Sequence, residues 1–259
     1  MPDQRASCLA GQLFRTGTAP AQSLPSAPLV ADARAFANTQ HTKGCPVSHI
    51  KRLTTFLLLC CALRVSTAMA SDTLIVHVYL HDELAAVSEQ SLHSDYLQHW
   101  EDEMHTFTSH PIEVVFHRDI AGITDIDYAA SNDAAATLEA FHRAVTELKF
   151  QHYPSGINKS ILVTESVFQT LDNGYETQGL AQFEGNFAIA SRGSYASLAH
   201  EIGHMLGATH ENAEKQIKVW PLKCETYVFP QRAWDRAHCY RYSDANRDNI
   251  TAHLQSHSQ

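Results

Sequence analysis

The sequence predicts an α/β fold with a mostly parallel β-sheet. Apolar runs typical of strands occur at residues 73–80, 112–120 and 159–166. Segments with helical periodicity separate these runs, so that strand and helix alternate along the chain. Successive strands joined through helices form right-handed crossovers, which place the strands parallel in one sheet.

The first strand and the first helix are the clearest elements. Residues 73–80, TLIVHVYL, are β-branched or apolar at nearly every position, as expected of a strand that is covered on both faces. In residues 88–108, large apolar side chains recur at spacings of three and four, which predicts a helix. They are Leu92, Tyr96, Leu97, Trp100, Met104 and Phe107.

The next strand, helix and strand follow the same logic. Residues 112–120 begin directly after Pro111 and form the second apolar run. Asn132 or Asp133 can cap a long helix, whose apolar stripe consists of Ala135, Leu138, Phe141, Ala144, Val145 and Leu148. Residues 159–166, KSILVTES, are the third predicted strand.

Two shorter apolar segments, residues 177–183 and 186–191, are joined by Glu184 and Gly185. A link this short favours a hairpin. One of the two strands then runs against the others, and the sheet is mixed.

Residues 197–211, SLAHEIGHMLGATHE, concentrate metal-binding side chains on a predicted helix. His200 and His204 lie one helical turn apart and share a face. Gly207 can end the helix and turn the chain, so that His210 reaches the same ion. Three neutral imidazoles leave a fourth position open for water, as in catalytic zinc sites. Glu201 then lies beside this water and can act as its general base.

The alternative is a solvent-exposed helix that carries histidines without binding metal. The chain has 17 histidines, and short motifs arise by chance in such a composition. The added Gly207 and His210 make a chance match much rarer than one to the HExxH pattern alone.

Residues 200–210 match the HExxHxxGxxH signature, and in this the sequence resembles the metzincin zinc metallopeptidases, of the reprolysin-like and astacin-like bacterial type. The resemblance implies one catalytic Zn²⁺ and a five-stranded mixed, twisted sheet. It also implies two long helices, a zinc-site helix and a small C-terminal subdomain. The catalytic domain would span residues 71–259, divided into 71–207 and 208–259.

The resemblance also implies a substrate site along the fourth strand of the sheet. Gly179, Leu180 and Ala181 resemble the cleft edge of reprolysin-like members, where an extended peptide binds by strand addition. The alternative is that residues 177–183 are a sheet edge with no such role.

The sequence departs from this family at the methionine that follows the third histidine, because its four methionines all precede His210. One alignment places Val228 in the methionine's position, within CETYVF. A second alignment places Tyr240 there and makes Tyr242 a fifth ligand or an oxyanion donor. We prefer the first, because Cys224 and Cys239 then bracket the turn.

The N-terminal 70 residues differ from the rest. Residues 51–70 have basic residues, an apolar run and the triplet Ala68-Met69-Ala70, which is the layout of a signal peptide; a membrane anchor is the alternative. We expect residues 1–50 to be disordered or not translated. The protein would then be secreted or periplasmic. In such a chain Cys224 and Cys239 form a disulfide, or remain as a buried free pair.

The formal net charge of −9 argues against nucleic acid or an anionic membrane as a partner. We expect a monomer that acts on peptide or protein substrates. The leading hypothesis is an exported zinc endopeptidase with Glu201 as general base. The alternatives are a hydrolase of another amide, or a non-catalytic protein that binds zinc or a peptide.

Overall fold

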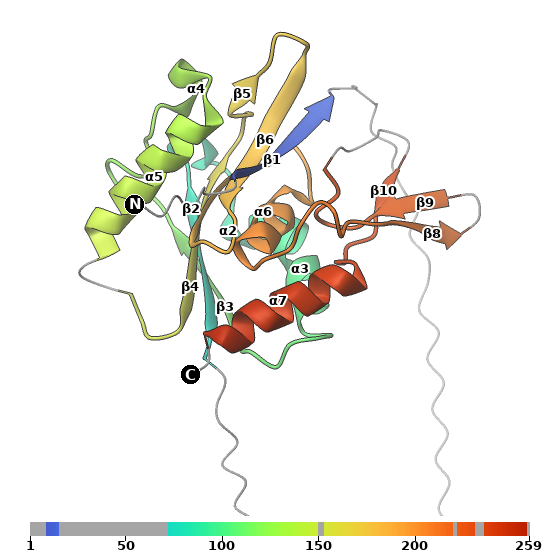
Figure 1. Cartoon of the computed structure of the whole chain (residues 1–259). Helices are drawn as coiled ribbons and strands as arrows, with labels where there is room; N and C mark the ends of the chain where they lie inside the picture. The colour runs from blue at the N-terminus through green and yellow to red at the C-terminus, as the bar shows by residue number, and fades with distance from the viewer. Residues whose placement is uncertain (1–8, 16–71, 150–152, 220–221, 231–235, 258–259) are drawn as a thin grey trace, which may run out of the picture. The chain divides into compact units, whose positions relative to one another are not determined.

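A seven-stranded sheet forms the centre of the computed structural model, which describes residues 9–15, 72–149, 153–219, 222–230 and 236–257 (Figure 1). The strand order is β1-β6-β7-β4-β2-β3, and β5 pairs with β6. The strands are β1 (Leu9–Arg15), β2 (Leu74–Leu80), β3 (Ile112–His117), β4 (Ile157–Thr164), β5 (Gln169–Thr170), β6 (Tyr175–Gln182) and β7 (Phe187–Ser191).

The directions of the strands confirm the predicted α/β fold with a mostly parallel sheet. Strands β3, β2, β4 and β7 run parallel to one another. Strand β6 runs antiparallel to β7, as its tight link predicted. The sheet has seven strands and not five, because β1 and β5 both add to β6.

Strand β1 lies in the segment that we expected to be disordered or untranslated. Residues 9–15 instead pair antiparallel with the outer edge of β6. An edge strand carries unpaired N–H and C=O groups, which explains why a segment of weak periodicity is recruited to it. The predicted signal peptide, residues 51–70, lies outside the described residues.

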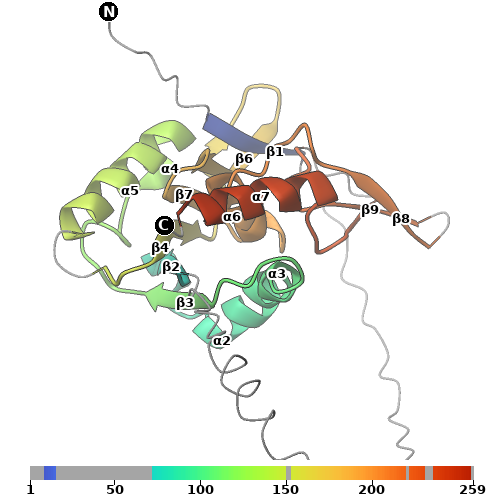
Figure 2. The same cartoon turned by 60° about the horizontal axis from the view of Figure 1, so that its bottom comes forward.

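Helices cover both faces of the sheet, with α5 on one face and α3 and α6 on the other (Figures 1 and 2). The predicted helix over residues 88–108 forms as α2 (Glu89–Leu92), a π-helical turn (His93–Leu97) and α3 (Gln98–Met104). The other helices are η2 (Asp82–Leu84), α4 (Tyr128–Ser131), α5 (Ala134–Lys149), α6 (Ser197–Met205) and α7 (Asp244–Ser256). Every residue of β2 is buried, as its unbroken apolar sequence predicted. Within the described part of the chain, no helix has both the length and the apolarity to cross a bilayer.

A second, three-stranded sheet follows α6 in the chain. It has the order β10-β9-β8, from β8 (Lys215–Val219), β9 (Leu222–Glu225) and β10 (Ala237–His238). The disulfide between Cys224 and Cys239 is confirmed, with an S–S distance of 2.07 Å. It joins β9 to the residue that follows β10.

A buried carboxylate connects α3 to the C-terminal elements. Glu103 Oε1 accepts hydrogen bonds from Tyr242 N and Arg247 Nε, both at 2.9 Å. Its Oε2 accepts from Arg247 Nη2 at 2.8 Å. Only 6% of Glu103 is exposed, so this bidentate ion pair supplies the partners that a buried charge requires.

We expect Arg247→Met to destabilise the fold by about 3 kcal/mol, because it leaves Glu103 buried without its cation. Urea unfolding followed by circular dichroism measures the change. The matched control is Arg143→Met, which removes an exposed pair with Glu139 and should cost less than about 0.5 kcal/mol. Equal losses of unfolding free energy in the two variants would show that the buried pair contributes no more to stability than the exposed one.

Candidate metal centre

Helix α6 presents His200 and His204 on one face and its apolar residues to the core. Leu198, Ile202 and Met205 are at most 1% exposed and belong to the core cluster. This apolar face fixes the helix against the sheet, and the i, i+4 spacing then places the two imidazoles one turn apart.

The chain turns sharply after α6 at Gly207, whose φ is +91°. Ala208 N donates to Gly203 O at 2.9 Å, and Gly207 N donates to His204 O at 3.1 Å. These bonds close the end of the helix with glycine in the left-handed region, where a side chain would be strained. The turn brings His210 back to the other two histidines, as the sequence predicted.

The three imidazoles converge through their Nε2 atoms. The distances are 3.0 Å from His200 to His204, 3.0 Å from His204 to His210 and 3.1 Å from His200 to His210. Three nitrogens bound to one zinc ion are spaced by roughly 3.3 Å, given Zn–N bonds of about 2.0–2.1 Å. The arrangement therefore fits a single ion.

Hydrogen bonds to backbone carbonyl groups fix the protonation of two rings. His200 Nδ1 donates to Tyr227 O and His204 Nδ1 donates to Ala208 O, each at 2.8 Å. We assign the proton to Nδ1 because a carbonyl can only accept, which leaves Nε2 with a free lone pair. The short Nε2 contact between these two rings is therefore not a hydrogen bond, and a cation between them would relieve the repulsion.

Burial keeps the three imidazoles neutral. It lowers the pKa of His204 to about 4 and holds that of His200 well below its usual value, and the neighbouring histidines add to the effect. The pKa of His210 is also lowered, chiefly by burial. Neutral imidazole is the form that binds divalent metal, so the site is prepared at neutral pH.

Glu201 is completely buried, and neither carboxylate oxygen has a hydrogen-bond partner among the described residues. Burial raises its pKa well above the usual value. Orphaned buried polar groups are rare in folded proteins and often mark a reactive site. The sequence predicted Glu201 as general base, and the carboxylate lies on α6, the helix that bears His200 and His204.

Gly179 makes room for this carboxylate. A Cβ atom at this position would overlap the carboxyl group and Cγ of Glu201, so the Glu201 side chain would have to shift. Gly179 was predicted to bind substrate, and the structure gives it a second role, since β6 can pass Glu201 only at a glycine.

Val228 and Tyr242 pack against α6 at Gly203. A Cβ on Gly203 would lie 3.2 Å from Val228 Cγ1 and 2.7 Å from Tyr242 Cε1. Val228 thus lies where the first alignment put it, whereas Tyr240 packs against His99 and Tyr227.

Tyr242 does not lie where a fifth ligand or an oxyanion donor, the roles given to it by the second alignment, would meet a substrate. Its side chain is fully buried, and its hydroxyl donates to Ala199 O at 2.6 Å, on the underside of α6. Sequence reasoning also missed Gly203 as the close-packing position. A glycine inside a helix costs about 1 kcal/mol relative to alanine, and this was the available signal.

The outer edge of β6 is not free in this structure. Gly179, Leu180 and Ala181 pair with Gln12, Gly11 and Ala10 of β1. The side chains of Leu180 and Ala181 are buried in the two core clusters. Only the backbone of this segment can meet a peptide, and here β1 takes that place.

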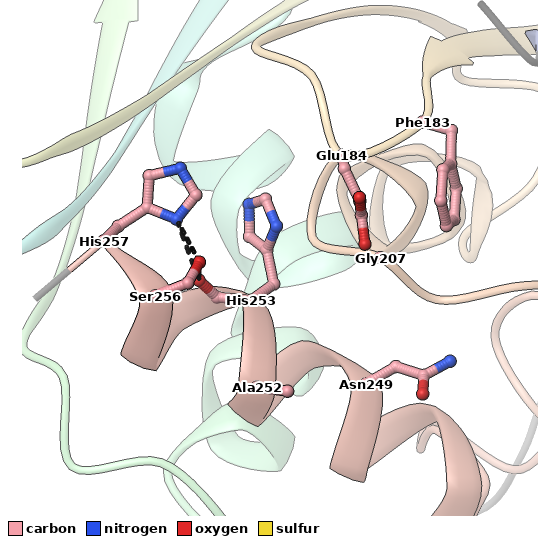
Figure 3. A pocket seen from close by; sticks show the side chains of 8 residues that line it. All are labelled: Phe183, Glu184, Gly207, Asn249, Ala252, His253, Ser256 and His257. Atoms are coloured by element: carbon pink, nitrogen blue, oxygen red, sulfur yellow. Dashed lines mark hydrogen bonds between the residues drawn. The ribbon is translucent and has the colours of Figure 1, made fainter. Parts of the chain in front are cut away.

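A pocket of about 500 Å³ lies between α7 and the β6–β7 turn (Figure 3). His253 and His257 line it, but within the described ranges only His200, His204 and His210 form a three-residue group able to hold a metal. Burial and the neighbouring Lys159 lower the pKa of His253 to about 3, and its Nε2 lies 3.1 Å from Lys159 Nζ. This contact joins α7 to β4.

We expect His210→Ala to weaken Zn²⁺ binding by at least about a hundredfold, because one of three ligands is lost. Competition with a chromophoric chelator measures the affinity. His99→Ala, which removes an exposed histidine outside the triad, is the matched control and should bind as the wild type does. Unchanged affinity in His210→Ala would contradict the assignment of the third ligand.

No family model matches the chain, and no curated protein matches it. Among solved structures, metalloproteinase-II from Bacteroides fragilis is similar, with 20% sequence identity and a TM-score of 0.50 over 71% of this chain and 53% of that chain. A zinc-dependent peptidase from Methanocorpusculum labreanum is 16% identical, with a TM-score of 0.42 over 68% of this chain and 99% of that one. The chain spans about half the length of the Bacteroides protein. The likeness to that protein shows that this chain has the fold of a known metalloproteinase structure.

Proposed function

We propose that this protein is a zinc-dependent endopeptidase. One observation carries the proposal, namely three converging imidazole Nε2 atoms with an unpartnered, buried carboxylate on the helix that bears two of them. A site that only stores zinc has no need of a free carboxylate beside its open position. The fold shared with a metalloproteinase supports the same conclusion.

His200, His204 and His210 would hold the ion, and Glu201 would move the proton. Bound zinc lowers the pKa of a water ligand and polarises a substrate carbonyl. Glu201 accepts the proton of the attacking water and later delivers it to the departing amine nitrogen. Its enclosed position favours this exchange, because burial raises the carboxylate's affinity for a proton.

The substrate would bind as an extended chain along β6. Backbone bonds to an edge strand require no free terminus, which favours cleavage within a chain. β1 occupies this edge antiparallel to β6, and a substrate strand would take its place. The contacts are mainly to backbone, since Leu180 and Ala181 turn their side chains into the core.

We also infer export, with cleavage after Ala70, to the periplasm or the exterior. The charge and apolar pattern of residues 51–70 supports this inference, as does the disulfide between Cys224 and Cys239. Processing at Ala70 would remove residues 9–15 and expose the edge of β6.

The first test replaces the general base. We expect Glu201→Gln to keep stoichiometric zinc and to lose at least about a hundredfold in the rate of cleavage, because the amide cannot accept a proton. Hydrolysis of an unfolded protein, read by mass spectrometry, is measured for the full chain and for residues 71–259. Cleavage by the variant at the wild-type rate would exclude the mechanism, and zinc binding by a wild type that cleaves nothing would favour a binding protein.

The second test uses the contact between β6 and Glu201. Gly179→Ala inserts a methyl group into the space that the Glu201 carboxylate occupies, so the carboxylate must move. We expect about a hundredfold lower kcat, since displacements of about 1 Å at a catalytic group have this effect. Zinc content should stay at the wild-type level, which separates this result from loss of the site. A fully active Gly179→Ala would show that Glu201 works from another position.

A further inference from the structure

The third histidine of the metal centre is held differently from the other two. His200 and His204 lie on α6, and the Nδ1 atom of each donates to a backbone carbonyl. His210 lies beyond the end of α6, in a segment that is neither helix nor strand, and it is only partly buried. Among the described residues, none forms a hydrogen bond with its Nδ1 atom. The position of this imidazole therefore depends on how the backbone around it is fixed.

The side chain of Asn246, on α7, fixes the residue immediately before His210. Asn246 Oδ1 accepts a hydrogen bond from Thr209 N at 2.9 Å, and Asn246 Nδ2 donates to Thr209 O at 3.1 Å. The amide orientation follows from these partners, because a backbone N–H can only donate and a carbonyl can only accept. One side chain thus bonds both backbone groups of a single residue, as the paired residue of an antiparallel strand does.

The first turn of α7 also holds the chain after His210. Ser243 Oγ donates to Asn212 O at 2.5 Å, and the same oxygen accepts from Asn246 N at 3.2 Å. Ser243 is the N-cap of α7, and both it and Asn246 are completely buried. α7 therefore bonds the chain one residue before His210 and two residues after it, so that His210 lies between the two contacts.

A helix by itself would not favour asparagine at position 246. Asparagine has a lower helix propensity than alanine or leucine, because its side chain competes for backbone hydrogen bonds. Ile250 and Leu254, which are also buried on α7, are apolar and belong to the core cluster. An apolar side chain at 246 would leave Thr209 N and O without these partners in a buried setting, which is costly. The bonds to Thr209 therefore explain the asparagine.

We propose that Asn246 is a positioning residue of the metal centre, which holds His210 in place for zinc through the backbone of Thr209. The inference rests on the zinc site of the proposed function. Residues that orient metal ligands from outside the coordination sphere contribute about ten- to a hundredfold to metal affinity. α6 holds two ligands in position before an ion binds, and Asn246 does the same for the third. In this way α7, which bears no ligand, becomes part of the metal centre.

The test is the affinity of the full chain for Zn²⁺, measured by competition with a chromophoric chelator in the Glu201→Gln background, so that cleavage plays no part. We expect Asn246→Ala to weaken binding about ten- to a hundredfold. Asn249→Ala is the matched control, because it removes the same type of side chain from the same helix. The Asn249 side chain hydrogen bonds to no described residue of the segment around His210, so this variant should bind zinc as its parent does. Parental affinity in Asn246→Ala would overturn the proposal, whether or not the protein is a peptidase.

A double-mutant cycle separates positioning of His210 from a general effect on folding. If Asn246 acts through His210, adding Asn246→Ala to His210→Ala should weaken zinc binding by less than about twofold. The absorption spectrum of bound Co²⁺ is a second readout, because it reports the geometry of the ligands. We expect Asn246→Ala to change this spectrum toward that of His210→Ala. Equal losses of affinity with and without His210 would overturn the proposal.

Asn246→Asp serves in the same cycle if Asn246→Ala does not fold. It keeps the shape of the side chain and the acceptor for Thr209 N, but it loses the donor to Thr209 O. Its effect on zinc affinity should likewise disappear in the His210→Ala background. An effect of the same size in both backgrounds would contradict a role through His210.

Discussion

The structure depends on holding three imidazole Nε2 atoms within 3.1 Å of one another. The lone pairs on the Nε2 atoms of His200 and His204 repel each other unless a cation sits among the three rings. The protein meets this constraint with backbone groups. Ala208 O orients His204 from within the turn, and Tyr227 O orients His200 from the C-terminal part of the chain. The metal centre is therefore complete only when the segments before and after Gly207 are packed together. The bonds from Glu103 to Arg247 and Tyr242 N serve this packing from a distance.

Two glycines determine how closely other elements approach α6. Gly203 admits Val228 and Tyr242 beneath it, and Gly179 admits the Glu201 carboxylate on the side of β6. Neither glycine has a φ in the left-handed region, so both are explained by space and not by backbone conformation. The methionine that the metzincin resemblance led us to look for is absent, and Val228 packs beneath Gly203 of α6.

Elements with strong periodicity could be predicted from sequence, and so could the spacing of the metal ligands. Strand β2 is apolar at every position but His77 because it is buried on both faces, and α5 has a clear apolar stripe because one of its faces packs into the core. The short strands β5 and β10 have two residues each, too few for any pattern. Helix α7 was missed because it buries only Asn246, Ile250, His253 and Leu254. The role of Tyr242 could not be read either, because motif spacing does not reveal which side of a helix a distant residue packs against.

The pairing of β1 with β6 has a consequence for how the protein behaves in solution. A bare strand edge next to a hydrophobic core invites copies of the same chain to join through it and aggregate. While residues 9–15 cover this edge, β6 cannot recruit another molecule there. A chain without residues 9–15 has an unpaired β6 edge. Its solubility would then depend on how quickly another polypeptide strand pairs with this edge.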